Sequence, residues 1–299
     1  FGGIVQNVFT ILKNVAIAFI VIVALIFGAG SVAHFSPFIN SALQYPSGSL
    51  LGGIVLALSG AFWAYDGWNN ITYLGAEVKE PQRNIPKAMM TGMMFVIVVY
   101  ILVNLAYFYV LPVDVIKDST LVASDVMNKA VGSWGGAFVA IAVMVSTFGT
   151  TNGTILVSAR VYYAMAKDRL FFRKLEDVHH KYRTPGVSII IQGLWASLIT
   201  MTGSFDQLTD MLIFVSWIFY GIGAYGVFVL RKKMPDAERP YKAFGYPVLP
   251  AIFVLFSAFF VGFSVWYNVR NAVFGLILVA MGIPLYFYFR KNQTTDKAD

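Results

Sequence analysis

The sequence predicts an all-α integral membrane protein with eight transmembrane helices. Apolar residues make up 58% of its 299 residues and charged residues only 12%, about half the charged fraction of a soluble domain. Several stretches exceed the ~18 consecutive apolar residues that mark a transmembrane helix. In lipid, spans of this length satisfy their backbone hydrogen bonds as helices. A cytosolic enzyme, a nucleic-acid-binding protein and a secreted disulfide scaffold are therefore excluded.

Hydropathy and basic residues together give the predicted topology. The eight spans are 7–28, 50–75, 87–111, 135–166, 186–203, 208–230, 247–267 and 271–290. The connections after the second, fourth, sixth and eighth spans hold 3, 7, 5 and 3 Lys or Arg residues, whereas the other side holds only Lys117, Lys129 and Arg270. The positive-inside rule assigns the basic side to the cytoplasm, so both ends of this chain are expected to face the cytoplasm.

The start of the chain, the absence of Cys and the small number of His residues bear on two further questions, whether the chain is complete and whether it could be an enzyme. The chain starts at Phe1 and enters a hydrophobic span without the features of a signal peptide, so we interpret it as part of a longer protein. Cysteine is absent, and two of the three His residues, His179 and His180, lie in a basic connection. We therefore expect no metal, no cofactor and no enzymatic activity.

The second span contains Asp66, the only acidic residue deep within a predicted span. Residues that form helices poorly follow it, namely Gly67, Trp68, Asn69 and Asn70. We predict two half-helices, about 50–65 and 68–76, that meet near the bilayer midplane. Their free carbonyl and N–H groups would bind the ammonium and carboxylate of a zwitterion. The alternative is an unbroken helix in which Asp66 pairs with a cation elsewhere in the bundle.

The first and fourth spans contain further polar residues. Lys13 either extends to the cytoplasmic interface or is an ammonium buried where another transporter would hold sodium. The fourth span is about 48 Å long at ~1.5 Å per residue. Gly149 and Gly153 in its middle have the spacing of close helix packing. The Ser and Thr hydroxyls beside these glycines and the amide of Asn152 are not required for helix packing. We therefore expect some of them to face Lys13 or a water-filled cavity.

Aromatic residues are concentrated in the sixth span, where Phe214, Trp217, Phe219 and Tyr220 fall within two turns. Most aromatic residues of membrane helices are packed or interfacial, so their spacing alone favours packing over a gating role.

Several segments resemble the amino acid–polyamine–organocation superfamily. Within it, the chain resembles the L-type amino acid transporters and their bacterial homologues, the light-chain family of heteromeric amino acid transporters. Residues 62–69 (FWAYDGWN) and 76–88 (AEVKEPQRNIPKA) resemble that family's sixth helix and following loop. The eighth helix and the loop after the tenth are matched by 146–153, 159–166, 239–242 and 245–247.

The resemblance implies a fold as well. The eight spans would be helices five to twelve of a twelve-helix transporter with five-plus-five inverted repeats, the leucine-transporter-like fold. Residues 1–299 would form one transmembrane domain without the first four helices, which a complete site needs. Within it, 7–28 would be the last helix of the first repeat, 50–230 the second repeat and 247–290 two additional helices.

The resemblance also implies a substrate site. Its residues would be Trp63, Ala64, Tyr65, Asp66, Gly67, Asn69 and Trp217. Trp63 corresponds to the aromatic gate, the carbonyls of 63–66 would receive the substrate ammonium, and Trp217 corresponds to an aromatic residue of the distal pocket. Lys13 matches a lysine that replaces sodium, and Ser146 and Thr147 would lie near it.

The expected function is sodium-independent secondary transport of L-amino acids across the cytoplasmic membrane by exchange. A proton-coupled symporter is the alternative if Lys13 loses its proton during the cycle. A channel or membrane receptor, with Asp66 lining a pore or pocket, is the alternative from a different class. Trp63 and Tyr65 favour small neutral substrates, whereas Asp66 would attract a cationic side chain. The expected partners are the amino acid and the lipid bilayer, with no nucleic acid.

Overall fold

The computed structural model describes residues 2–36, 50–239 and 241–295. Every regular element in these ranges is a helix, and seven segments are long and apolar enough to cross a membrane. The chain is therefore a multi-pass membrane protein, as predicted. The predicted span 186–203 corresponds to α7 (Gly186–Thr200), which has only 15 residues and so reaches about 22 Å of a ~30 Å hydrocarbon layer. An eighth spanning helix is thus not confirmed.

The chain divides into two compact units that alternate along the sequence. Of the described residues, the first comprises 2–36 with 87–158, and the second comprises 50–86 with 159–239 and 241–295. Two helices, α3 (Pro81–Val110) and α6 (Ser133–Lys167), continue from one unit into the other. Each unit has its own buried apolar residues, so each is described separately.

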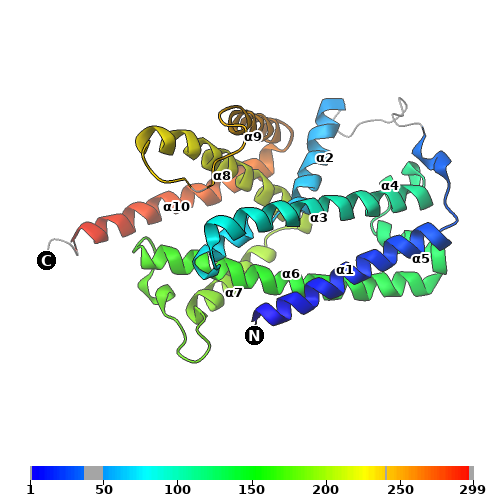
Figure 1. Ribbon diagram of the computed structural model, residues 1–299, viewed down its shortest axis with the longest axis horizontal. Helices are drawn as coiled ribbons and strands as arrows, with labels where there is room; N and C mark the ends of the chain where they lie inside the picture. Colours follow the sequence, from blue (N-terminus) through cyan, green and yellow to red (C-terminus); the bar gives the residue numbers. More distant parts are fainter. Residues whose placement is uncertain (1, 37–49, 240, 296–299) are drawn as a thin grey trace. The chain divides into compact units, whose positions relative to one another are not determined.

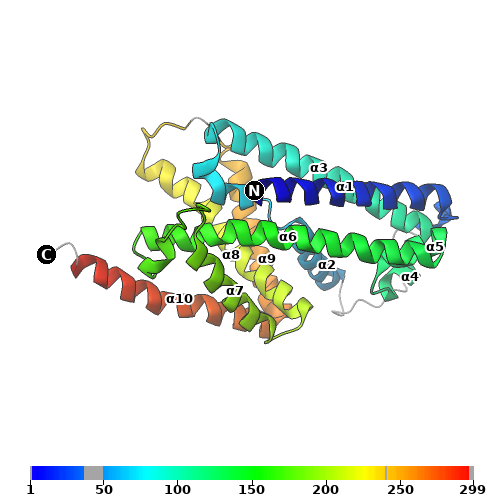
Figure 2. The ribbon, with the colours of Figure 1, turned by 90° about the horizontal axis from the view of Figure 1, so that it is seen from below.

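The first unit is built around α1 (Gly2–Phe27), which packs against both α3 and α6 and runs alongside them (Figures 1 and 2). Its apolar face packs on α3 through Val21, Ala24, Ala106 and Val110. Shorter helices complete the unit, namely η1 (Val32–Phe35), α4 (Val113–Asp118) and α5 (Val122–Val131). Met127 of α5 is buried against α1 and α6, so the core of this unit lies at the α5 end of α1.

The second unit contains α2 (Leu50–Tyr65), η2 (Asn70–Glu77), η3 (Arg173–Glu176), α7 and three long helices. These are α8 (Phe205–Lys233), α9 (Val248–Tyr267) and α10 (Val269–Thr295). α8 packs against α2, α9 and α10 and begins with a capping box formed by Ser204 and Gln207, which satisfies N–H groups at its start. Buried residues of α2, α8 and α9 form the core of this unit.

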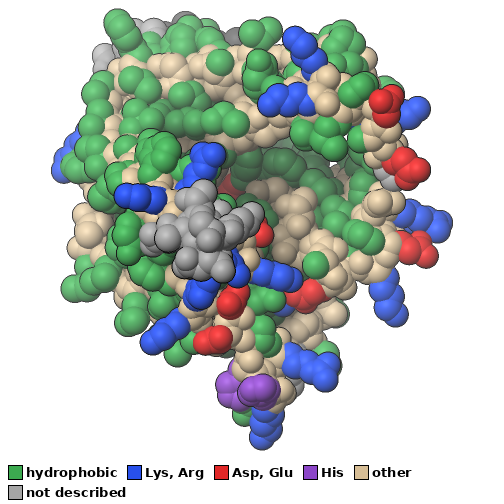
Figure 3. All heavy atoms as spheres, turned by 90° about the vertical axis from the view of Figure 1, so that its left-hand side faces the viewer, with side chains coloured by type: hydrophobic (Ala, Val, Ile, Leu, Met, Phe, Trp, Pro, Cys, Tyr) green, Lys and Arg blue, Asp and Glu red, His purple; other side chains and the backbone are tan. Residues whose placement is uncertain are grey.

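The basic connections of the second unit lie at one end of its helices. The α6–α7 and α8–α9 connections and the end of α10 are on the same side in Figures 1 and 2. The face that carries them displays many Lys and Arg side chains (Figure 3). The other ends of α7, α8 and α10 carry few basic residues, among them Arg270. In the second unit, the connections that are rich in Lys and Arg in the sequence are thus also grouped at one end of the helices.

Candidate functional site

The discontinuity that the sequence predicted is present. α2 ends at Tyr65, and residues 66–69 form turns before η2, a 3-10 helix, begins at Asn70. Gly67 has φ +96°, which residues with a side chain rarely adopt. Residues 50–77 nevertheless form one segment long and apolar enough to span a membrane. The interruption therefore lies within a spanning segment, and its second half begins two residues later than predicted and is not α-helical.

Asp66, at the interruption, accepts a hydrogen bond from the Tyr220 hydroxyl of α8 at 2.9 Å. The same hydroxyl lies 3.4 Å from Asn69 Oδ1, and Asn69 Nδ2 donates to the Tyr73 hydroxyl at 3.0 Å. The ring of Trp68 packs 5.3 Å from that of Tyr220. A polar network thus joins both sides of the interruption to α8. The unbroken helix of the alternative interpretation is wrong, and the partner that this network gives Asp66 is a neutral hydroxyl.

The remaining predicted residues of this segment lie at the end of α2. The carbonyl of Trp63 accepts the N–H of Asp66 at 3.2 Å, and the Trp63 ring meets that of Phe205 edge-on with centroids 5.9 Å apart. Trp63 is 40% exposed, Ala64 is exposed and Tyr65 is half-buried. The structure therefore brings residues 63–67 and Asn69 together around one turn of chain.

Trp217 occupies a different environment, in the aromatic core of the second unit. It is 8% exposed, and its ring lies 4.2 Å from Phe62, 5.6 Å from Phe253 and 5.3 Å from Phe260, measured between centroids. Rings at such distances stabilise one another beyond their buried area. For Trp217 the structure supports the packing that its spacing favoured, and a role in a distal pocket stays a prediction.

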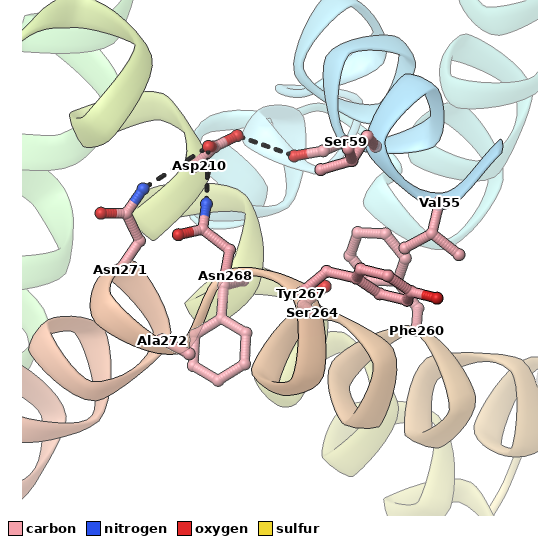
Figure 4. Close-up of a pocket in the computed structure, with 11 residues that line it drawn as sticks. Val55, Ser59, Asp210, Phe260, Ser264, Tyr267, Asn268, Asn271 and Ala272 are labelled. Carbon is pink, nitrogen blue, oxygen red and sulfur yellow. Dashed lines mark hydrogen bonds between the residues drawn. The ribbon is translucent and has the colours of Figure 1, made fainter. Parts of the chain in front are cut away.

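A second polar cluster, which was not predicted from the sequence, is centred on Asp210 of α8 (Figure 4). One carboxylate oxygen accepts a hydrogen bond from Ser59 Oγ of α2 at 3.0 Å. The other accepts from Asn268 Nδ2 at 3.0 Å and Asn271 Nδ2 at 3.5 Å. The cluster borders a cavity of about 30 Å³, enough for about one water molecule. Asp210 thus links α2, α8 and the α9–α10 junction.

The sequence indicated this cluster only weakly, because most of its polar residues lie at the edges of predicted spans. Asp210 lies near the edge of the predicted span 208–230, where an acidic residue is common, and Asn268 and Asn271 flank the boundary of another span. In the described ranges, no three His, Cys, Asp or Glu side chains lie close enough together to hold a metal ion. The hydrogen bonds of Asp210 connect different helices.

The far end of η2 is fixed by an ion pair. Arg160 Nε lies 2.5 Å from Glu77 Oε1, and Arg160 Nη2 donates to Glu77 Oε2 at 3.1 Å. The side chain of Arg160 is 21% exposed and that of Glu77 is 60% exposed. Two parallel bonds between a guanidinium and a carboxylate fix orientation as well as distance. η2 is therefore held at the interruption by Tyr220 and at its end by α6.

Lys13 lies in the first unit, half-buried on α1. Contacts on both sides of it pair α1 and α6 in antiparallel order, with the ring of Phe9 4.9 Å from Phe148 and that of Phe19 4.7 Å from Phe138. A Cβ at Gly149 would lie 2.6 Å from Phe9 Cβ. Because the helices are antiparallel, counting four residues forward from Phe9 and four back from Gly149 places Lys13 opposite residue 145. Ser146 lies one residue and Thr147 two residues beyond this level on α6, and their place beside Lys13 stays a prediction.

The glycines of α6 have the packing role that their spacing indicated. Gly149 allows the close approach of Phe9, and a Cβ at Gly153 would lie 3.0 Å from the Gln6 side chain. Asn152 Nδ2 donates to Gln6 Oε1 at 3.2 Å. The polar residues of this stretch thus form an inter-helix hydrogen bond to Gln6, which the sequence did not indicate.

Comparisons with known proteins show the family of the chain. A model of the family described as amino acid permease matches residues 1–287. The serine/threonine exchanger SteT of Bacillus subtilis is 31% identical over 298 residues, covering 99% of this chain and 66% of SteT. The b(0,+)-type amino acid transporter 1 of Mus musculus is 32% identical, covering 96% of this chain and 58% of that protein. The large neutral amino acids transporter small subunit 2 of Mus musculus is 31% identical, covering 95% of this chain and 52% of that protein. The chain spans about half to two thirds of the length of these curated relatives.

Proposed function

Because the chain belongs to the amino acid permease family, we propose that it transports L-amino acids and binds them at residues 63–69. The observation that carries this proposal is the interruption of a spanning segment between Tyr65 and Asn70. The carbonyl end of α2 carries partial negative charge and the N-terminus of η2 partial positive charge. Discontinuous helices of transporters bind zwitterionic substrates at such ends. No side chain caps the start of η2, and the Asn70 N–H donates to the Gly67 carbonyl at 3.1 Å, a bond that a substrate carboxylate would replace.

Asp66 is the residue we propose for discrimination among side chains. Its carboxylate is exposed and accepts its hydrogen bond from the neutral Tyr220 hydroxyl, so a substrate cation would add an attraction that no ion pair among the described residues supplies. The bulk of Trp63 and Tyr65 favours small neutral amino acids. Small neutral substrates are therefore the first expectation and cationic ones the second.

Lys13 is proposed to stand in for a transported sodium ion. The support is that Ser146 and Thr147 lie within one turn of α6 from the level of Lys13, and hydroxyl oxygens are suitable acceptors for an ammonium. A permanently charged Lys13 would give sodium-independent exchange by alternating access, whereas a Lys13 that releases its proton would give proton-coupled symport.

The topology is proposed from the basic residues. The basic face would be cytoplasmic, with both ends of this chain inside the cell. Residues 50–230 would belong to the second inverted repeat, and 7–28 and 247–290 would flank it. The protein would then reside in the cytoplasmic membrane, with further helices of the same protein completing the site.

The test is uptake of labelled L-serine and L-arginine by proteoliposomes that contain the full-length protein, without sodium. We expect uptake that depends on preloading the vesicles with amino acid. Equal uptake into empty vesicles under an inward proton gradient would instead establish a symporter. A steady current in the absence of substrate would overturn transport in favour of a channel.

Two variants test the site itself. Asp66→Asn is expected to abolish arginine uptake and leave serine uptake measurable, because only the attraction to a substrate cation is lost. Asp206→Asn, which removes an exposed carboxylate from the first turn of α8, is the matched control and should transport both substrates as the unmodified protein does. Retained arginine uptake in the Asp66 variant would exclude the proposed role of this carboxylate.

A further inference from the structure

A groove of about 350 Å³ opens in the second unit, at the helix ends opposite the basic connections. It is bounded by the C-terminal end of α7 and the N-terminal ends of α8 and α10. α8 and α10 are spanning helices, so their ends lie at a membrane interface. The volume falls within the range of ligand pockets, ~300–1,000 Å³.

The lining of this groove is segregated by depth. Polar side chains line it at or within one turn of the helix ends, and they are Thr202, Gln207, Arg270 and Asn271. Apolar side chains line it from there toward the middle of the helices, and they include Trp195, Leu198, Met211, Phe274, Ile277 and Leu278. From Arg270 to Leu278 the lining extends about 12 Å along α10 at ~1.5 Å per residue, close to the ~15 Å thickness of one leaflet's hydrocarbon. The groove is thus polar at the interface and apolar along nearly the depth of one leaflet.

Arg270 supplies the only charge in the lining. Its guanidinium lies 6.0 Å from the centre of the Phe274 ring, and in the described ranges no carboxylate pairs with it. The nearby Asp210 carboxylate is instead occupied by Ser59 and the two Asn side chains. An exposed guanidinium matches the geometry of a phosphate, which it binds with two parallel hydrogen bonds.

From these features we propose that the groove binds one phospholipid of the surrounding bilayer. The headgroup phosphate lies on Arg270, and one acyl chain follows the apolar lining of α7 and α10. A phospholipid combines the two required properties, an anion at the interface and a chain directed to the bilayer centre. Because the lining contains a guanidinium and no carboxylate, an anionic headgroup binds more tightly than a zwitterionic one. This site is independent of the proposed transport function.

The proposal is tested by native mass spectrometry of the full-length protein titrated with phosphatidylglycerol or phosphatidylcholine. We expect tighter binding of the first phosphatidylglycerol. Arg270→Gln should weaken it about tenfold, the size of one charge-assisted hydrogen bond, and abolish the preference over phosphatidylcholine. Lys117→Gln, which removes a cation of α4 in the other unit, is the matched control and should change binding less than twofold. Equal weakening in both variants would mean unspecific attraction and would overturn the site.

A second variant and tryptophan fluorescence test whether an acyl chain occupies the apolar lining of the groove. Leu198 is 59% exposed, so Leu198→Trp fills the groove without disturbing the core, and we expect loss of the first bound lipid. Brominated phosphatidylglycerol should quench fluorescence in the unmodified protein, and Trp195→Phe should remove most of that quenching. Displacement of the lipid by inorganic phosphate would mean an anion site without a chain. A dimer that Leu198→Trp dissociates while lipid binding persists would mean that a second copy occupies the groove. Either result would overturn the proposal.

Discussion

Replacing Asp210 with Ala removes at once the acceptor that joins three helices. The bonds from Ser59 and Asn268 are 3.0 Å long, within the usual range. The Asn271 contact of 3.5 Å is at its limit. The variant therefore loses two effective inter-helix hydrogen bonds.

The magnitude follows from what such bonds contribute in a membrane. Hydrogen bonds between transmembrane helices stabilise by about 0.6 kcal/mol on average and up to about 1.7 kcal/mol, because the unfolded chain in the bilayer also finds partners. A charged acceptor favours the upper value, so Asp210→Ala is expected to lower the free energy of unfolding by about 2–3 kcal/mol. Water can enter the polar cavity beside it, so we add no penalty for an empty cavity. Asp210→Asn, which keeps one acceptor oxygen, should lose about half as much.

The assay is equilibrium unfolding of the full-length protein in mixed micelles, with Ser59→Ala as the partner in a double-mutant cycle. We expect a coupling energy of about 1 kcal/mol between the two positions, since each single variant breaks the same bond. Additive effects, or an Asp210→Ala variant as stable as the unmodified protein, would refute the inference that this cluster holds the helices together.

Three further changes test the interruption and its supports. Gly67→Ala should lower the free energy of unfolding by about 1–2 kcal/mol, because φ +96° is unfavourable once a Cβ is present, whereas Gly60→Ala, whose Cβ meets open space, should be neutral or stabilising. Arg160→Gln should cost about 1 kcal/mol of unfolding free energy and less at high salt, since its partner carboxylate is largely exposed. A loss that salt leaves unchanged would argue against the ion pair. Tyr220→Phe should raise arginine uptake relative to serine uptake by about threefold, as freeing the Asp66 carboxylate removes one hydrogen bond of ~0.6 kcal/mol, and an unchanged ratio would show that this bond does not limit binding.

Much of the fold followed from local sequence. The apolar stretches predicted all seven spanning segments found in the described residues. Asp66 with Gly67 predicted the end of α2 at residue 65. The eighth span was not confirmed, because 186–203 has the composition of a transmembrane helix but α7 ends at Thr200 after 15 residues. The second half-helix starts later than predicted, since turns at 66–69 use residues that were assigned to it.

The site was predicted only in part. Residues 63–69 were found because poor helix formers within an apolar span are conspicuous. Asp210 was not found, because its partners lie 151, 58 and 61 residues away along the chain. The hydroxyl partner of Asp66 was also missed, since Tyr220 is 154 residues distant and its spacing indicated only packing.

The sequence by itself determined that this protein lies in a membrane, which segments form its long helices, and where one of them is interrupted. These properties depend on hydropathy and on backbone preferences, which each short segment carries within it. Only the tertiary structure decided that Trp217 is buried among aromatic rings, that Asp210 joins α2 to the α9–α10 junction, and that Arg270 lies at the mouth of an apolar groove. Each of these depends on the distance between side chains of different helices, which is set by how those helices pack.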